Sequence, residues 1–195
     1  MESPTLILAS GSPRRKELLH QLGYQFEVVK PDVEECQTAE ESPVQYVERL
    51  SQDKAFAGVQ LAPPNAVVIG SDTIVVAGSD VLEKPQDLTD AKRMLLRLSG
   101  TSHQVMTAVT VATQTKHKSV VVTTDVWFKA LDQAEIEQYW QSGEPCDKAG
   151  SYAIQGLGGR FVTRIEGSYY AVVGLPLFET DQLLHEFIIY FEVCS

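Results

Sequence analysis

Residues 5–15 have the sequence TLILASGSPRR, which sets the start of the fold as a strand that leads into a helix. The apolar run at its beginning predicts a short buried β-strand. Ser12 is a natural N-cap, and Pro13 suits the first helical position because its missing N–H costs nothing there. We therefore expect a helix that continues to Leu22 and is closed by Gly23.

The turn between this strand and helix, which begins at Ser10, has the features of an anion site. Small residues before a helix leave backbone N–H groups unpaired at the positive end of the helix dipole. Arg14 and Arg15 add guanidinium groups whose planar shape suits phosphate oxygens. The alternative is a capped surface helix with solvated arginines, and this segment alone does not separate the two.

The chain has 195 residues, of which 44% are hydrophobic and 22% charged, enough for one core or for two lobes that fold as one unit. We therefore expect a single domain over residues 1–195. The net charge of −10 argues against nucleic-acid binding, which needs a basic face. It allows a small polyanionic substrate if lysines and arginines gather locally, with the help of a divalent metal.

Targeting signals and cysteine usage predict a cytoplasmic protein with no membrane anchor. The N-terminus does not resemble a signal peptide, and the apolar runs are far too short to cross a membrane. Cys36, Cys146 and Cys194 fit neither a zinc pattern nor a disulfide framework. A reducing compartment is therefore the default expectation.

Helices and strands alternate early in the chain and hairpins dominate later, so we predict a mixed-sheet α/β fold. The β-rich runs predict strands at residues 5–9, 25–29, 66–77 (broken at 70–73), 103–113, 119–130, 160–165 and 169–173. Helices are expected to end near residues 22, 61, 99, 141 and 187, the middle three capped by Ser42, Thr89 and Asp132. The apolar tail 188–193 is expected to be packed or to lie at a subunit contact.

Asp72 is the sharpest anomaly because it interrupts a strongly apolar strand. A buried carboxylate without partners would be costly. It is either a turn or bulge residue that bonds nearby N–H groups, with Gly70 permitting the bulge, or a metal ligand or general base. Glu35 is a candidate second oxygen ligand for Mg²⁺, although a solvated acidic loop residue is its commoner role.

Lys54 and Lys84 are candidates for the positive charge that a triphosphate needs, together with Arg14 and Arg15. Each lysine alone is most simply a solvated side chain. Only the four basic residues together indicate a triphosphate site.

The loop 147–156 carries Lys148 and Gln155 among glycines that permit close approach of the backbone to a ligand. Gln155 has both a donor and an acceptor, so it is a candidate for reading the edge of a base; a satisfied polar loop residue is the alternative. His103 has no partner at metal-ligand spacing and is assigned a structural role.

These motifs together resemble the Maf family of septum-formation-inhibitor-like nucleotide pyrophosphatases. The matching segments span nearly the whole chain in order: residues 10–19, 70–73, 83–85, 148–152 and 173–176. The resemblance implies hydrolysis of a nucleoside triphosphate to the monophosphate and pyrophosphate, with Mg²⁺ or Mn²⁺. It also implies a two-lobed fold like that of the inosine triphosphate pyrophosphatases, a site in the cleft between the lobes, and a homodimer.

The resemblance assigns roles residue by residue. Asp72 matches the family's proton acceptor, and Glu35 with Asp72 would hold the metal. At Arg14, Thr73 and Gln155 the chain resembles the dTTP/UTP pyrophosphatases. The 7-methyl-GTP pyrophosphatases typically have Trp, Gln and Glu at these positions. The other substrate-binding candidates are Ser10, Arg15, Lys54, Lys84 and Lys148. The tail after Phe187 matches nothing in the family.

The alternative from another class is a regulator that acts in cell division by binding partners. Nucleotide would then be a ligand and not a substrate. The complete set of charged site residues favours the enzyme.

Overall fold

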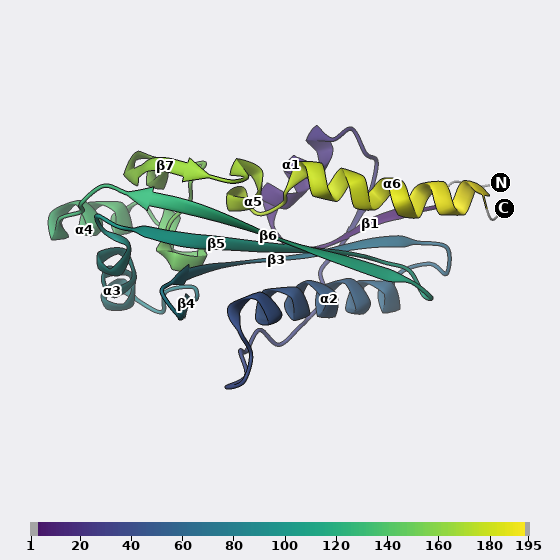
Figure 1. Cartoon of the computed structure of the whole chain (residues 1–195), viewed down its shortest axis with the longest axis horizontal. Coiled ribbons are helices and arrows are strands. Elements are labelled where there is room, and N and C mark those ends of the chain that lie inside the picture. The colour runs from purple at the N-terminus through teal and green to yellow at the C-terminus, as the bar shows by residue number, and fades with distance from the viewer. Residues whose placement is uncertain (1–3, 194–195) are drawn as a thin grey trace. The chain divides into compact units, whose positions relative to one another are not determined.

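The computed structural model describes residues 4–193, whose strands form a mixed sheet (Figure 1). The strands are β1 (Leu6–Ala9), β2 (Glu27–Val29), β3 (Val67–Ala77), β4 (Asp80–Leu82), β5 (Ser102–Ala112), β6 (His117–Phe128) and β7 (Val162–Glu166). Their order is β2-β1-β3-β5-β6-β7, and β4 pairs with β3. β1 is parallel to β2 and β3, whereas β3–β4 and β6–β7 are antiparallel. The predicted mixed-sheet α/β class is confirmed.

Side-chain caps mark the start of four of the helices in the described residues. They are α1 (Pro13–Gln21), α2 (Pro43–Leu61), α3 (Leu88–Leu98), α4 (Gln133–Gln141), α5 (Tyr169–Val173) and α6 (Leu177–Val193), with 3₁₀ turns η1 (Glu144–Asp147), η2 (Ala149–Ser151) and η3 (Leu157–Phe161). Ser12 caps α1, and Ser42 forms a reciprocal capping box with Gln45 at α2. Asp132 caps α4 as predicted.

Two predicted boundaries are wrong near the site. β3 is a continuous strand and is not broken at residues 70–73. The cap of α3 is Asp87, whose side chain accepts from the Asp90 N–H at 2.8 Å, so the helix begins earlier than a Thr89 cap predicts.

Residues 169–173 form a helical turn and not the predicted strand. The run is apolar, which suits either structure. Ser168 decides between them: its Oγ accepts from the Ala171 N–H at 3.2 Å and its carbonyl from the Val172 N–H at 3.2 Å. These bonds close a helical turn directly after Gly167.

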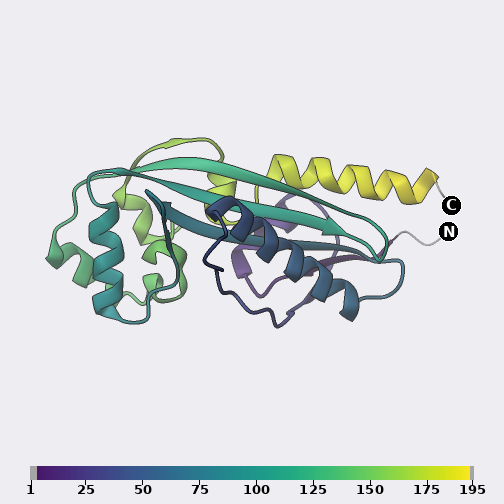
Figure 2. The same cartoon turned by 60° about the horizontal axis from the view of Figure 1, so that its bottom comes forward.

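The chain divides into two compact units, with crossing points inside β3, β5 and β6. The first unit contains the residues up to 72, residues 107–122 and those from 174 onward. Figures 1 and 2 show α2 and α6 on opposite sides of its strands. A Cβ on Gly58 would lie 2.7 Å from Ala9 Cβ and from Val68 Cγ1, so α2 packs very closely on β1 and β3.

The second unit contains residues 73–106 and 123–173, and α3 packs beside α4 in it. Its core includes an aromatic cluster in which His103 lies edge-on to Phe128 and Tyr152, with centroids 4.9 and 5.5 Å away. His103 is 3% exposed, and its Nε2 lies 2.8 Å from the Tyr152 hydroxyl. This burial fits the structural role expected for His103.

The last helix continues beyond its predicted end near residue 187, to Val193. The expected packing of the tail falls mainly on side chains 189–193, which lie outside those described. Within residues 4–193, the structure contains no helix with the length and apolar character that a membrane span requires.

Candidate active site

Asp72 lies in β3 just beyond the point where β1 stops pairing with it. The last paired residues of the two strands are Ala9 and Gly70. Asp72 is only 7% exposed, and its Oδ1 accepts a hydrogen bond from Lys54 Nζ at 2.5 Å. The turn alternative is therefore wrong, since Asp72 lies within a continuous strand and its carboxylate is paired with a lysine.

The same ammonium group binds a second carboxylate. Lys54 Nζ lies 2.6 Å from Glu35 Oε1, and the Lys54 side chain is only 12% exposed. A largely buried charge of this kind is tolerated only when its partners are close and well placed. The structure thus brings Glu35, Lys54 and Asp72 into one cluster, although they come from a loop, a helix and a strand.

Close packing of α2 on β3 places Lys54 next to Asp72. A Cβ on Gly70 would lie 2.3 Å from the Ser51 carbonyl oxygen and 2.4 Å from the Ala55 nitrogen. Only glycine leaves room for the helix backbone at that distance. Gly70 therefore serves the contact between helix and strand, and not a strand break.

The turn before α1 has the predicted capped geometry. Ser10 is buried, and its Oγ accepts from the Ser12 N–H at 3.1 Å, while the Ser12 side chain accepts from the Arg15 N–H at 3.4 Å. Arg14 is half-buried. The two serines thus hold the start of the helix and its arginines in a fixed conformation.

The carbonyl of Gly174 ties this turn to the strand that carries Asp72. It accepts from Arg15 Nε at 2.8 Å and from the buried Ser71 hydroxyl at 3.2 Å. Burial lowers the pKa of the Arg15 guanidinium; nearby Asp72 acts to raise this pKa, Arg14 to lower it and Glu35 to raise it. Arg15 therefore belongs to the same charge cluster, with one of its N–H groups committed to the backbone.

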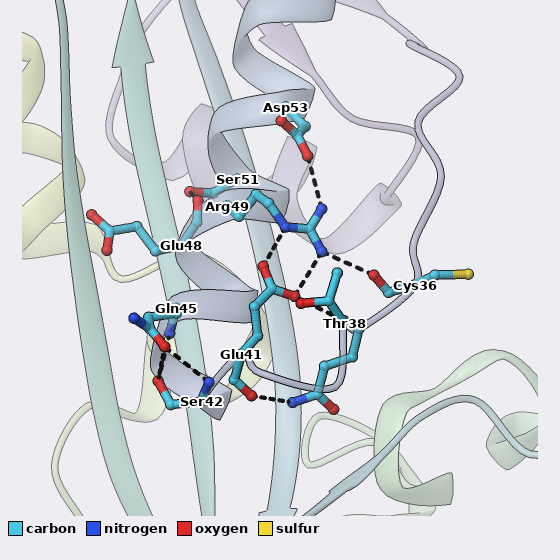
Figure 3. Close-up of polar contacts among 10 residues, drawn as sticks. Cys36, Thr38, Glu41, Ser42, Gln45, Glu48, Arg49, Ser51 and Asp53 are labelled. Atoms are coloured by element: carbon cyan, nitrogen blue, oxygen red, sulfur yellow. Dashed lines mark hydrogen bonds and ion pairs between the residues drawn. The ribbon is translucent and has the colours of Figure 1, made fainter.

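Arg49 anchors the loop that carries Glu35, as Figure 3 shows. Its Nε and Nη2 bind the two oxygens of Glu41 at 2.5 and 3.0 Å, Nη2 donates to the Cys36 carbonyl at 2.9 Å, and Nη1 lies 3.1 Å from Asp53. The hydrogen bond from Arg49 lowers the pKa of Glu41 to about 2. The sequence analysis missed this anchor, although Arg49 and Asp53 have the spacing of a helical ion pair.

The other predicted site residues lie in the second unit. Lys84 and Gln155 are exposed, Thr73 follows Asp72 in β3, and Lys148 pairs with Asp147. The Gly150 N–H donates to the Glu83 carbonyl at 3.2 Å, which brings the 83–85 and 148–152 motifs together.

Gly150 and Ser151 carry unusual backbone angles in this second motif. Gly150 has φ +66°, and a Cβ there would lie 2.8 Å from Val75 Cγ1. Buried Ser151 adopts φ +63°, a conformation that non-glycine residues rarely hold and that is often found at functional sites.

The donor set for a metal is small. Among the side chains that the structure describes, no group of three or more from His, Cys, Asp and Glu is placed to hold an ion. Glu35 and Asp72 nevertheless direct oxygens at the same cation, the Lys54 ammonium. Two carboxylates suit Mg²⁺ when substrate phosphates and water complete the coordination, so the pair fits the expected metal.

The structure thus defines a mixed α/β protein in which carboxylates, a lysine and an arginine form one cluster. The chain belongs to the Maf-like protein family, which it matches over residues 5–187. The resemblance inferred from the motifs is confirmed.

Individual relatives match over nearly their full length. The dTTP/UTP pyrophosphatase of Vibrio cholerae serotype O1 is 74% identical over 182 residues, covering 93% of this chain and 97% of that one. The protein of the same name from Salmonella typhimurium is 56% identical over 183 residues, with coverages of 94% and 93%. Among solved structures, the Staphylococcus aureus Ham1 protein matches 64% of this chain and 71% of its own, with 14% identity and a TM-score of 0.44.

Proposed function

We propose that this protein hydrolyses dTTP and UTP to the nucleoside monophosphate and pyrophosphate. The 74% identity to the Vibrio cholerae dTTP/UTP pyrophosphatase, over nearly the full length of both chains, supports this substrate class. The observation that carries the proposal is the Lys54 ammonium group shared by Asp72 and Glu35, beside the capped helix that bears Arg14 and Arg15.

Asp72 would accept a proton from the water that attacks the α-phosphorus, and pyrophosphate would leave. Proton transfer needs a carboxylate held in a fixed position, and the hydrogen bond from Lys54 to Oδ1 supplies that restraint. Arg14 and Arg15 would stabilise charge that develops on the phosphates. Ser10 would contribute by holding the turn beneath them.

Glu35 and Asp72 would hold Mg²⁺ or Mn²⁺ through their carboxylate oxygens. When bound, such a cation polarises the phosphate and neutralises part of its charge. The Lys54 ammonium has three N–H donors, so it would keep its hydrogen bond to Asp72 and offer another N–H to a phosphate oxygen.

Base selection would fall to the second unit. Uracil and thymine present an acceptor–donor–acceptor edge, and the Gln155 amide offers both a donor and an acceptor to it. A site that leaves a polar group unpaired with the wrong base can discriminate strongly against it. Thr73 would assist from β3, and Lys84 and Lys148 would contact the phosphates.

The test is a nucleotide panel with Mg²⁺ or Mn²⁺ in which pyrophosphate and phosphate are detected separately. We expect pyrophosphate release from dTTP and UTP in preference to 7-methyl-GTP. Release of phosphate instead would place the cleavage at another bond, and a reversed base preference would refute the pyrimidine assignment. Binding without turnover would favour the nucleotide-binding regulator with cell-division partners.

We also propose that the protein works in the cytoplasm as a homodimer. The exposed Cys36 and Cys146 are free thiols, which suits a reducing compartment. Light scattering coupled to gel filtration tests the dimer, and a monomer mass at micromolar concentration would contradict it.

A further inference from the structure

The loop that carries Gln155 is held on both sides by one pair of side chains. Tyr139, on α4, accepts a hydrogen bond from the Ala153 N–H at 3.1 Å and donates to Glu144 Oε1 at 2.6 Å. Glu144 in turn accepts from the Leu157 N–H through Oε2 at 2.9 Å and from the Gly158 N–H through Oε1 at 2.9 Å. The restrained backbone therefore brackets Gln155.

The loop backbone also lies directly on the carboxylate. A Cβ on Gly156 would be 2.0 Å from Glu144 Oε2, so the residue after Gln155 has no room for a side chain. The pair is itself rooted in the core, because Tyr139 is fully buried and packs edge-on to Phe161 with centroids 4.9 Å apart. The backbone around Gln155 is thus held by contacts that lead to Tyr139 on α4.

The charge state of Glu144 suits this task. Partial burial acts to raise the pKa of its carboxyl, but the hydrogen bonds from Tyr139, Gly158 and Leu157, together with the charge of Lys148, outweigh that effect and leave the pKa below its ordinary value. An ionised carboxylate accepts hydrogen bonds and donates none, which matches three donors that point at it. The neutral amide of a glutamine would place a donor against at least one of them.

We propose that Glu144 and Tyr139 are positioning residues for base selection, which fix the backbone on both sides of Gln155 and so determine which base its amide accepts. This inference rests on the proposed function, since it assumes that Gln155 reads the base. Discrimination by hydrogen bonds needs the reading group held within a fraction of an ångström, and a loop alone does not provide that.

The test measures kcat and KM for UTP and for GTP in Glu144→Gln and Tyr139→Phe. We expect the UTP-to-GTP ratio of kcat/KM to fall by about tenfold in each, through a raised KM for UTP, because a charge-assisted hydrogen bond is lost in both. Tyr139→Phe keeps the ring in the core, so it remains informative if Glu144→Gln folds poorly. Glu137→Gln is the matched control and should keep the ratio, because Glu137 lies in the same helix as Tyr139 but is exposed and pairs with Lys92.

Gln155→Ala separates the positioning role of Glu144 and Tyr139 from base reading by Gln155 itself. An unchanged ratio in Gln155→Ala would overturn base reading by Gln155 and with it this part of the proposed function. A ratio that falls in Gln155→Ala but not in Glu144→Gln or Tyr139→Phe would overturn the positioning role alone. An equal loss of kcat for both nucleotides, with the ratio preserved, would also overturn it, because that pattern reports general damage.

Discussion

At the scale of single residues, the proposed chemistry depends on one acid, Asp72, whose partner Lys54 lies 18 positions earlier in the chain. Sequence alone identifies Asp72, because a carboxylate inside an apolar strand is conspicuous. It cannot identify the pairing with Lys54, since a lysine on a helix is ordinarily solvated. The contact depends on how closely α2 approaches β3, which only tertiary packing determines.

Asp72→Asn tests the acid directly. The amide has the same shape but is a poor proton acceptor, so kcat for UTP should fall by about 10²–10³-fold, the usual cost of one such contributor. Pyrophosphate release measures the rate, and thermal unfolding by circular dichroism checks the fold. Asp80→Asn, an exposed acid paired with Arg97, is the control and should keep full activity. Turnover of folded Asp72→Asn at the parent rate would remove Asp72 from the mechanism.

Because His103 is buried, we expect the free energy of unfolding to depend on pH. Burial lowers the pKa of His103 to about 4, against about 6.5 in the unfolded chain. Between these values the unfolded state binds more protons, so the stabilising contribution is fully present above pH 6.5 and declines as the pH falls through this window. The expected loss between pH 6.5 and 5 is about 1.5 kcal/mol of unfolding free energy. Urea unfolding of the parent and His103→Gln at both pH values measures it; an equal loss in both would contradict the assignment.

At the scale of elements, the limits of α2 follow from local signals, and the conformation of residues 169–173 does not. Ser42 and Pro43 begin α2, and Pro63 follows shortly after its end, so the boundaries need no tertiary information. The run 169–173 is too short for its apolar pattern to separate helix from strand. Its helical turn depends on Ser168, which also bonds to Thr124 in β6.

Gly70→Ala tests the contact between α2 and β3. The added methyl would meet backbone atoms at 2.3 and 2.4 Å, which cannot move as a flexible side chain does. We expect a loss of about 2 kcal/mol or more in unfolding free energy, together with reduced activity as Lys54 is displaced from Asp72. Gly11→Ala is the stability control, since its Cβ would meet only Lys30 side-chain atoms at ordinary distances of 3.7–3.8 Å. Equal stability of the two variants would show that the helix and strand tolerate the methyl.

Arg49→Lys tests the anchor of the acidic loop in Figure 3. Lysine cannot bind Glu41 through two nitrogens and reach the Cys36 carbonyl at the same time. Because Cys36 directly follows Glu35, we expect faster amide hydrogen exchange over residues 35–41 and a severalfold lower kcat/KM. The change in global stability should stay below about 1 kcal/mol, as for other partly exposed ion pairs.

Arg93→Lys, which alters the exposed pair with Asp90 on α3, is the control for this exchange experiment. It should leave exchange over residues 35–41 unchanged. Protection in Arg49→Lys equal to the parent would mean that the loop is held by other contacts.

At the scale of the whole molecule, the sequence predicts fold class and family because its motifs follow one another in order from residue 10 to residue 176, within the family match over residues 5–187. The sequence is a less complete guide to the residues that hold the site in place. Arg49, Tyr139 and Glu144 act by holding loops through backbone carbonyls and N–H groups, and such contacts leave no signature in residue type or spacing. The expectation of one domain over residues 1–195 stays a prediction, and it can be tested on the two compact units.

The chain passes from one unit to the other within three strands, so the backbone of β3, β5 and β6 contributes to both. Loss of either unit would leave half of each strand without its neighbours, and we therefore expect a single cooperative unfolding transition. Trp127 and Trp140 both belong to the second unit, which makes tryptophan fluorescence a reporter of that unit alone. Gly70→Ala acts in the first unit, yet it should lower the fluorescence midpoint in urea as much as the far-ultraviolet circular dichroism midpoint. A fluorescence midpoint that stays at the parent value while the circular dichroism curve shifts would show that the two units unfold independently.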